Sequence, residues 1–279
     1  MSGIRLASCI SMFVLSLCAP HAAATAGCTP ISGLPAVITV PGQYCLTRNL
    51  SAERVLENDV AAIWIQADDV DINLGGHTLD GSGAKVLTGV IAEDRNRTWI
   101  HNGTIRGFIY GVSLFDNSSD FSASSGHLVS DVTFDHIQSG AIRIAGSGTE
   151  IRNNTFMKSG KTHGLSSPRV VSVAGPGSRI HHNTIIDTSV TLKGSGPEAI
   201  EVTYSPGCIV EDNEIINTTA KSLTVGVILW WSPGCAVRNN AFENPRNSPL
   251  DVGIWLIQSA GTDTSFNTFI NVTTEVMSQ

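Results

Sequence analysis

The stretch Ile180-His-His-Asn-Thr-Ile185 decides the fold, because it recurs along the chain, for example as Val210-Glu-Asp-Asn-Glu-Ile215 and Val237-Arg-Asn-Asn-Ala-Phe242. Most copies place a small polar residue between two apolar positions. The fourth positions of the eight copies are residues 77, 103, 132, 154, 183, 213, 240 and 267, so the spacing varies between 22 and 30 residues. A drifting period with a constant apolar register is typical of stacked coils whose length differences lie in loops.

A second apolar strand precedes this phrase in each coil, as in Ala141-Ile-Arg-Ile144 and Ala199-Ile-Glu-Val202. A glycine-containing turn such as Ser205-Pro-Gly207 joins the two, because a tight corner needs positive φ. Asparagine suits the bend inside the phrase, since it tolerates the left-handed region and its amide can bond to the same amide in neighbouring coils. The expected ladder consists of Asn154, Asn183, Asn213, Asn240 and Asn267.

Three short parallel strands per coil predict an all-β fold, a right-handed parallel β-helix of about eight coils with an N-terminal cap. Over roughly residues 61–272 the chain resembles the superfamily that includes pectate lyases, polygalacturonases and alginate-modifying enzymes. It also resembles small secreted bacterial β-helix proteins whose N-terminus reads like Ile38-Thr-Val-Pro-Gly-Gln-Tyr-Cys-Leu46. The resemblance implies a carbohydrate ligand, and it supplies no catalytic motif.

The first residues are typical of a secretory signal peptide. A single charge, Arg5, precedes an apolar stretch and small residues that end at Ala26. A lipid anchor at Cys18 or Cys28 is the alternative. No later stretch has enough consecutive apolar residues for a membrane span, so we expect a secreted or periplasmic protein. The expected division is 1–26 signal peptide, 27–60 N-terminal cap and 61–279 β-helix.

Four cysteines follow the signal: Cys28, Cys45, Cys208 and Cys235. An even count in an exported protein favours disulfides. Cys28 and Cys45 would staple the cap. Cys208 and Cys235 each follow a Ser-Pro-Gly turn at matching places in adjacent coils, about 4.8 Å apart, which a disulfide tolerates. Unlinked stacked thiols are the alternative for this second pair.

The chain carries 17 Lys and Arg against 24 Asp and Glu, a net charge of −7. This balance argues against nucleic acid as a partner, because nonspecific binding to it needs clustered basic residues. A strongly anionic polysaccharide is also an awkward ligand unless cations assist.

Because side chains alternate along a strand, one residue of the second strand of each coil points into the core and the next points outward. The expected inward residues are Val112, Ile142, Val171, Ile200, Val227 and Ile254, and the outward row is Ile91, Ser113, Arg143, Ser172, Glu201, Ile228 and Trp255. Water-facing aromatic rings beside charged groups indicate a binding surface for sugars. The expected substrate-binding residues are Tyr204, Trp230, Trp231 and Trp255. Alternatively, the loop 244–249 covers two of these rings as a satellite core.

Catalysis on a polyuronate needs a group that neutralises the carboxylate, a base and an acid. The candidate catalytic residues on this face are Arg143, Glu201, Arg169 and Lys193, with Tyr204 as a further donor. Hydrolysis instead needs two carboxylates, for which the pairs Glu198/Glu201 and Asp68/Asp69 are candidates.

No His-Glu-x-x-His or Cys-x-x-Cys motif occurs, so no cofactor is expected. A lesser alternative is calcium held by Asp251, Glu198 and Glu201.

The sequence therefore predicts an exported carbohydrate-binding protein with a polysaccharide or glycan partner, either a lyase, epimerase or hydrolase, or a noncatalytic adhesin or periplasmic assembly module. After Ile270 no helix is evident to cover the last coil, so we expect self-association through that coil.

Overall fold

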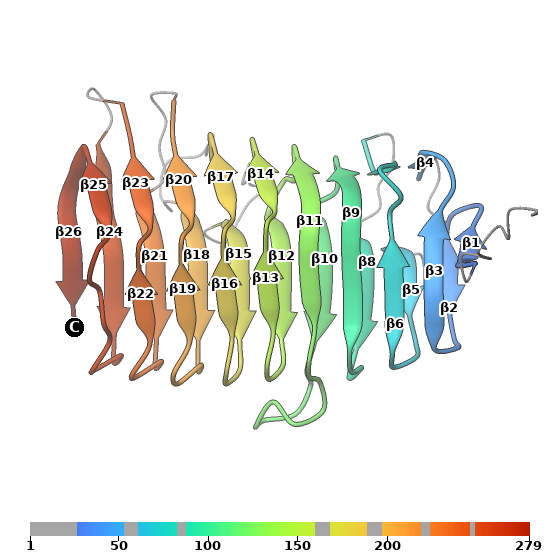
Figure 1. Cartoon of the computed structure of the whole chain (residues 1–279), viewed down its shortest axis with the longest axis horizontal. Coiled ribbons are helices and arrows are strands. Elements are labelled where there is room, and N and C mark those ends of the chain that lie inside the picture. Colours follow the sequence, from blue (N-terminus) through green and yellow to red (C-terminus); the bar gives the residue numbers. More distant parts are fainter. Residues whose placement is uncertain are drawn as a thin grey trace, which may run out of the picture.

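The computed structural model describes residues 27–52, 61–82, 88–159, 168–188, 197–218, 224–245 and 249–279. Within these ranges the regular structure is entirely β-strand. Figure 1 shows the coils stacked side by side along one axis, from β1 at one end to β26 at the other. Every strand pairs with its neighbours in parallel register. The predicted parallel β-helix is confirmed.

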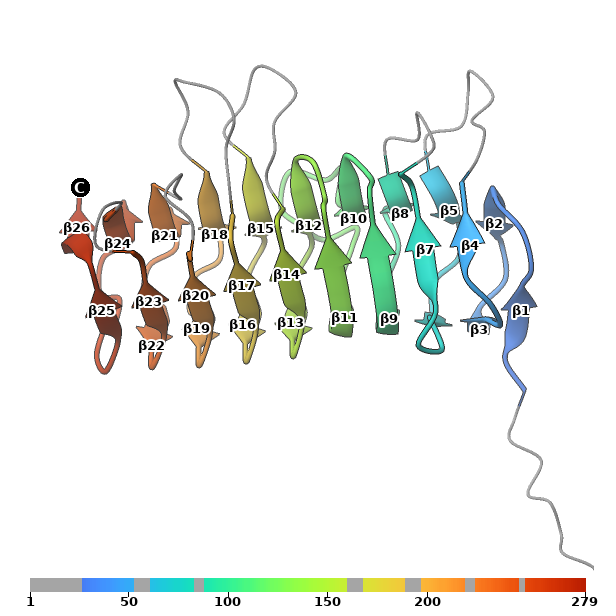
Figure 2. The same cartoon turned by 90° about the horizontal axis from the view of Figure 1, so that it is seen from above.

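One sheet, called sheet B here, takes the first strand of each coil. Its ten strands, in order, are β2 (Ala36–Ile38), β5 (Ala61–Ile65), β8 (Thr88–Glu93), β10 (Tyr110–Phe115), β12 (Gly140–Ala145), β15 (Arg169–Ala174), β18 (Glu198–Thr203), β21 (Val225–Trp230), β24 (Leu250–Ile257) and β26 (Val272–Ser278). Seen from above, these strands form one layer and the remaining strands form the other (Figure 2).

The second layer, sheet A, contains sixteen strands. They are β1 (Thr29–Ile31), β3 (Gly42–Leu46), β4 (Leu50–Ser51), β6 (Val70–Asn73), β7 (Thr78–Asp80), β9 (Thr98–Arg106), β11 (Leu128–Asp135), β13 (Glu150–Arg152), β14 (Thr155–Met157), β16 (Arg179–His181), β17 (Thr184–Ile186), β19 (Ile209–Glu211), β20 (Glu214–Ile216), β22 (Ala236–Arg238), β23 (Ala241–Glu243) and β25 (Thr268–Ile270). From β12 to β23 each coil has the three strands that were predicted, whereas β9 and β11 run through the bend without interruption.

The main core lies between the two sheets. The six residues predicted to point inward from sheet B are all fully buried. Aromatic rings of sheet A stack between neighbouring coils, with the Phe134 and Phe156 centroids 5.1 Å apart. Each coil buries its inward side chains against those of the neighbouring coils. This burial stabilises the stack, because no single coil can enclose an apolar core by itself.

The asparagine ladder is confirmed. The side-chain amide of Asn183 donates to Oδ1 of Asn213 at 3.0 Å, and Asn213 donates to Oδ1 of Asn240 at 2.9 Å. The predicted backbone reason is wrong, however, because the ladder residues do not have positive φ. The left-handed residue is the one just before each ladder asparagine, namely Asn153, His182, Asp212, Asn239 and Phe266, and Asn102 and Asp131 take the same place before Gly103 and Val132. The amide therefore serves hydrogen bonding alone.

The segment 27–52 continues both sheets. Strand β2 pairs with β5, and β3 pairs with β6, in the same parallel register as the rest. Cys28 and Cys45 form a disulfide with Cα atoms 5.7 Å apart. Because its sulfur is bonded to Cys45, Cys28 has no thiol available for a lipid anchor. The predicted signal peptide, residues 1–26, lies outside the described residues.

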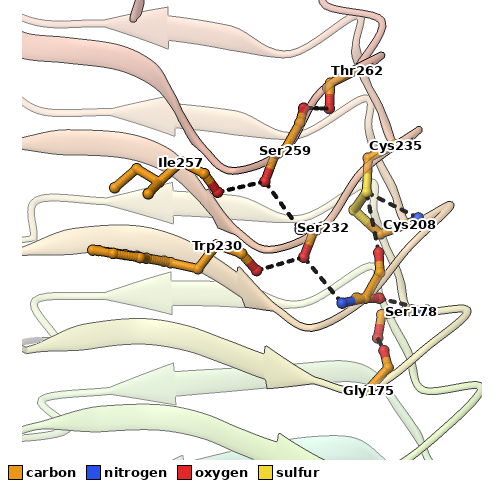
Figure 3. The surroundings of a disulfide bond; sticks show 10 residues. Gly175, Ser178, Cys208, Trp230, Ser232, Cys235, Ile257, Ser259 and Thr262 are labelled. Atoms are coloured by element: carbon orange, nitrogen blue, oxygen red, sulfur yellow. Dashed lines mark hydrogen bonds between the residues drawn. A yellow bond between two sulfur atoms is a disulfide. The ribbon is translucent and has the colours of Figure 1, made fainter. Parts of the chain in front are cut away.

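A second disulfide joins Cys208 and Cys235, whose Cα atoms are 4.5 Å apart in adjacent coils. Figure 3 shows it beside a row of serines at the corner after sheet B. The backbone N–H of Ser205 donates to Ser232 Oγ, and that of Ser232 donates to Ser259 Oγ, both at 3.0 Å. Hydroxyls thus satisfy buried amides at this corner as asparagines do at the other.

Candidate functional site

Side chains on the outer face of sheet B form columns across successive coils, because alternate residues of each strand face outward. The middle column is the row predicted to point outward, in register from β8 to β24. Four of its members are nevertheless buried: Ile91, Ser113, Glu201 and Ile228. Direction follows from alternation, but exposure depends on which neighbours lie over a side chain. Packing on this face therefore decides what a ligand can reach.

A charged cluster lies near the centre of this face. The guanidinium Nε of Arg169 lies 2.9 Å from Glu198 Oε2 and 2.9 Å from Glu201 Oε1. Ser172 donates its hydroxyl to Glu201 Oε2 at 2.8 Å. The parallel register produces these contacts, because Arg169 is paired with Glu198 and Ser172 with Glu201. Arg169 and Glu201, both candidate catalytic residues, are thus brought together with Glu198, the other candidate carboxylate for hydrolysis.

Burial raises the pKa of Glu198 above its usual value. The hydrogen bond and charge of Arg169 oppose this shift, while the nearby charge of Glu201 adds to it. Both carboxylates contact the same nitrogen, so their bonded oxygens are no more than twice 2.9 Å apart. Two carboxylates so close, one with a raised pKa, are a chemically suitable acid and base pair.

Arg143 occupies a different environment in the same column. Its Cζ lies 4.7 Å from the ring centroid of Tyr110 and 5.4 Å from that of Phe115. Its stem crosses Gly140, where an added Cβ would meet Arg143 Cγ at 3.2 Å. Among the residues that the structure describes, Arg143 makes no salt bridge, in contrast to Arg169. The guanidinium is therefore held by aromatic rings without a neutralising carboxylate.

Trp230 and Trp255 are only partly exposed, so they are not the fully water-facing rings that strand alternation predicted. They pack on a second apolar cluster, separate from the main core, of Val225, Ile228, Val252 and Ile257, together with Met277. Their ring centroids are 6.5 Å apart. Both indole N–H groups are buried, and within the described ranges neither has a hydrogen-bond partner. The satellite-core alternative describes these two side chains better, although residues 246–248 of the predicted covering loop lie outside the described residues.

Tyr204 and Trp231 remain exposed, at 50% and 47% of their surface. Both directly follow sheet B strands, both have positive φ, and their rings stack at 5.2 Å with an interplanar angle of 2°. The left-handed backbone at this corner aims both side chains in one direction along the stack. These two predicted binding residues are thus brought together at the edge of sheet B.

Sequence reasoning missed a third ring beside them. Phe121 lies in the segment between β10 and β11, and its centroid is 6.4 Å from that of Tyr204. Figure 1 shows this segment projecting below the coils, near the middle of the stack, and extending toward later coils. Gly146 leaves room for it, since a Cβ there would meet Ser124 O at 2.8 Å. The sequence indication was glycine at this corner in two coils, Gly146 and Gly175, where the next coil has Tyr204. Phe121, Tyr204 and Trp231 together are called the aromatic strip below.

The segment that carries Phe121 is held by internal hydrogen bonds. The backbone N–H of Ser124 donates to Asp116 Oδ2 at 2.7 Å, and that of Ser122 donates to Ser118 Oγ at 2.9 Å. Asp94 in turn accepts from the backbone N–H of Asn117 at 2.8 Å. The ring is therefore supported by a defined loop conformation.

Other predicted site residues lie elsewhere. Lys193 lies outside the described residues. Asp69 forms a salt bridge with Arg97 at 2.5 Å on a different part of the surface. Asp251 is exposed on β24. Within the described ranges, no three His, Cys, Asp or Glu side chains are grouped so as to hold a metal ion. The same ranges contain no helix of the length and apolarity that a membrane crossing requires.

The comparisons with known proteins agree with this architecture. Residues 88–273 match the family model described as "Right handed beta helix region". A comparison with curated proteins found no match. The matched segment covers well over half of the chain and includes the sheet B strands that carry the charged cluster and the aromatic strip. The chain therefore belongs to the right-handed β-helix family.

Proposed function

We propose that this protein is an exported glycan-binding β-helix protein whose ligand lies against the aromatic strip and the neighbouring outer face of sheet B. The observation that carries the proposal is the exposed pair Tyr204 and Trp231, stacked within 2° of parallel on adjacent coils. Exposed rings that lie side by side form an apolar patch, and such patches generally mark a binding surface, whereas singly exposed apolar side chains are common.

The chemistry of the strip suits a sugar. Because the Tyr204 and Trp231 rings stack on each other, they offer their edges and outer faces as apolar area, with little rotamer entropy to lose on binding, and the Tyr hydroxyl and Trp N–H supply polar contacts. The rings follow the coil repeat, so a chain ligand running along the stack would meet them in succession. Polar groups of the charged cluster lie on the adjoining coils and would provide hydrogen bonds to hydroxyls.

Export is supported by the cysteines as well as by the predicted signal peptide. All four cysteines after residue 26 are in disulfides, and structural disulfides persist mainly in oxidising compartments. A glycan ligand outside the cell or in the periplasm is consistent with both features.

Hydrolysis of the bound glycan is a second candidate, favoured by one observation. Glu198 and Glu201 share a single guanidinium nitrogen, and burial raises the pKa of Glu198. A retaining glycosidase uses two carboxyl groups at short separation, one of them protonated. An elimination reaction has less support, because Arg169, which would act on the substrate, is already bonded to both carboxylates.

The experiment is an affinity measurement on a panel of neutral and acidic polysaccharides, using native electrophoresis in gels that contain each glycan. Trp231→Ala and Tyr204→Ala should each weaken binding about 10-fold or more, as expected for a central aromatic contact. Trp64→Ala is the matched control, because Trp64 is 43% exposed but lies on β5, far from the strip along the stack. Equal losses for all three variants, or none, would refute the assignment.

New reducing ends measured on the glycan that binds best separate the second candidate from binding alone. Glu198→Gln should abolish their release if hydrolysis occurs. If the wild-type protein binds the glycan and releases none, the protein is a binding module.

A further inference from the structure

We infer that Arg143 is the receptor for a carboxylate carried at isolated positions along the glycan. The inference rests on the proposed glycan binding and names the class of glycan. Two arginines on neighbouring strands of sheet B, Arg143 and Arg169, differ in their surroundings. Arg169 is neutralised by two carboxylates at 2.9 Å, whereas Arg143 contacts only the rings of Tyr110 and Phe115 in the part of the chain that the structure describes.

The aromatic rings hold the guanidinium without using its hydrogen-bond donors. A cation over a ring face is attracted by the ring quadrupole, and this contact does not use the guanidinium N–H groups as donors to an oxygen. These N–H groups form a planar fork that matches the two oxygens of a carboxylate. The cradle therefore orients Arg143 in advance, and less side-chain entropy is lost when an anion binds.

A second unsatisfied group lies beside it. Ser113 is paired with Arg143 in the register of β10 and β12, is only 1% exposed, and its hydroxyl has no hydrogen-bond partner among the residues that the structure describes. A buried hydroxyl without a partner is unfavourable and calls for an explanation. Because the hydroxyl is buried, an anion on Arg143 reaches it only if the side chains above it shift on binding. The guanidinium without a salt bridge therefore carries the inference, and the Ser113 hydroxyl is a donor that such a shift would satisfy.

The charges around Arg143 limit what kind of anionic glycan fits. On sheet B the next strand toward the C-terminus carries Arg169, and the strand after it carries Glu198 and Glu201, two carboxylates that the single Arg169 guanidinium offsets only in part; Glu93 lies two strands in the other direction. The whole chain has a net charge of −7. A homopolymer with a carboxylate on every sugar would bring its other charges against these acids. A glycan with widely spaced carboxylates would not.

The distance to the aromatic strip sets the length of the ligand. Arg143 lies on β12 and Trp231 follows β21, three strand spacings further along sheet B, or about 14 Å. One sugar cannot contact both. The ligand is therefore an oligosaccharide segment that carries one carboxylate near Arg143 and neutral sugars against the strip.

The test uses two polymer series with graded charge, galacturonan of increasing methyl esterification and dextran of increasing carboxymethylation. Affinity should be highest at low carboxylate density and should fall for the fully charged polymer. Arg143→Met should reduce the affinity for the sparsely charged member to that for the neutral member, about 10-fold. Arg179→Met, on the outer face of sheet A, is the control. Arg143→Lys keeps the charge and should retain part of the preference if the Met variant fails to fold.

The two levels of the proposal fail differently. If the wild-type protein binds neutral and sparsely charged members equally, and Arg143→Met changes neither, the assignment of Arg143 is overturned while glycan binding stands. If affinity rises steadily up to the fully charged polymer, isolated carboxylates are not the preferred ligand and the inference is again overturned. If no member of either series or of the wider panel binds, both proposals fall.

Discussion

The side-chain amide of Asn183 donates to Oδ1 of Asn213 at 3.0 Å, and the backbone N–H of Asn183 donates to the same oxygen at 3.1 Å. Asn213 is 1% exposed. One oxygen therefore satisfies two buried donors of the previous coil, and its own amide repeats the arrangement one coil further on. The ladder fixes the bend between the two strands of sheet A by accounting for buried backbone groups that the strands leave unpaired.

Asn213→Ala is expected to lower the free energy of unfolding by about 3 kcal/mol, because it leaves buried donors and acceptors on both neighbouring coils without partners. Asn267→Ala is the matched control. It removes the last rung, which is part-buried and has a ladder partner on one side only, so its cost should be less than half. Urea denaturation measures both. Equal costs would show that stacking of the ladder contributes nothing beyond a local bond.

Gly103 stands where other coils have a ladder asparagine, and it has no room for a side chain. A Cβ there would collide with Leu74 and would lie 2.7 Å from the carbonyl oxygen of His77. Gly103→Ala should therefore destabilise the protein by about 2 kcal/mol through overpacking. Gly33→Ala is the control, since a Cβ at Gly33 meets nothing within 4 Å. Thermal unfolding that gives the same midpoint for both variants would contradict this account.

His127 makes stability depend on pH. Its Nδ1 accepts from the backbone N–H of Thr98 at 3.4 Å, and its Nε2 lies 2.6 Å from Ser124 Oγ. The Ser124 hydroxyl is also 2.8 Å from the carbonyl oxygen of Arg95, to which it donates. Only the neutral ring fits this network, and burial lowers the pKa of His127 to about 4. His127 and Ser124 therefore have a structural role, and Ser124 is not activated as a nucleophile because its hydroxyl donates to the Arg95 carbonyl oxygen.

Because the pKa of His127 is lower in the folded state, the unfolded state binds more protons between about pH 6.5 and 4. The stabilisation is complete above pH 6.5 and is lost as the pH falls, by about 3 kcal/mol at pH 4. His127→Thr, the residue found at the equivalent corner in Thr149 and Thr262, should remove this part of the pH dependence. Urea denaturation of both proteins at pH 7 and 4.5 tests it. Parallel losses in the two proteins would assign the effect to other groups.

The disulfide between Cys208 and Cys235 should add roughly 3 kcal/mol to stability, because it closes a loop across 27 residues of sequence separation. The double variant Cys208→Ser/Cys235→Thr introduces the residues of the equivalent corners, Ser178 and Thr262, so it removes the covalent bond with little change in shape. Guanidinium denaturation should show the loss while circular dichroism retains the β-helix spectrum. An unchanged midpoint would mean that the coils are fully ordered without the bond.

The fold could be predicted from the sequence because its causes are local and repeated. A recurring apolar pair, with an asparagine between its members in five coils, specifies inward residues such as Ile180 and Ile185, and eight repetitions of one pattern leave little room for another architecture. The error about positive φ has the same origin. Asn153 and Asn154 are adjacent, and only coordinates show that the first takes the left-handed backbone and the second the ladder.

The site could be predicted only in part, because exposure depends on packing between coils. Alternation placed Trp255 and Glu201 on the outer face, but their cover comes from neighbours whose side chains the pattern does not describe. Phe121 comes from a loop with no counterpart in other coils, so no repeat could align it with Tyr204. The Arg169 contacts needed the exact register of β15 and β18.

The most direct test of glycan binding at the aromatic strip is the ¹H–¹⁵N spectrum of the five tryptophan indoles, recorded while the best-binding oligosaccharide is added. The account predicts that the indole signal of Trp231 shifts most and that Trp230, whose ring centroid is 5.7 Å from it, shifts less. Trp64 and Trp99, exposed on other parts of the stack, should stay unchanged. A shift at Trp64 or Trp99 with none at Trp231 would contradict the proposed site.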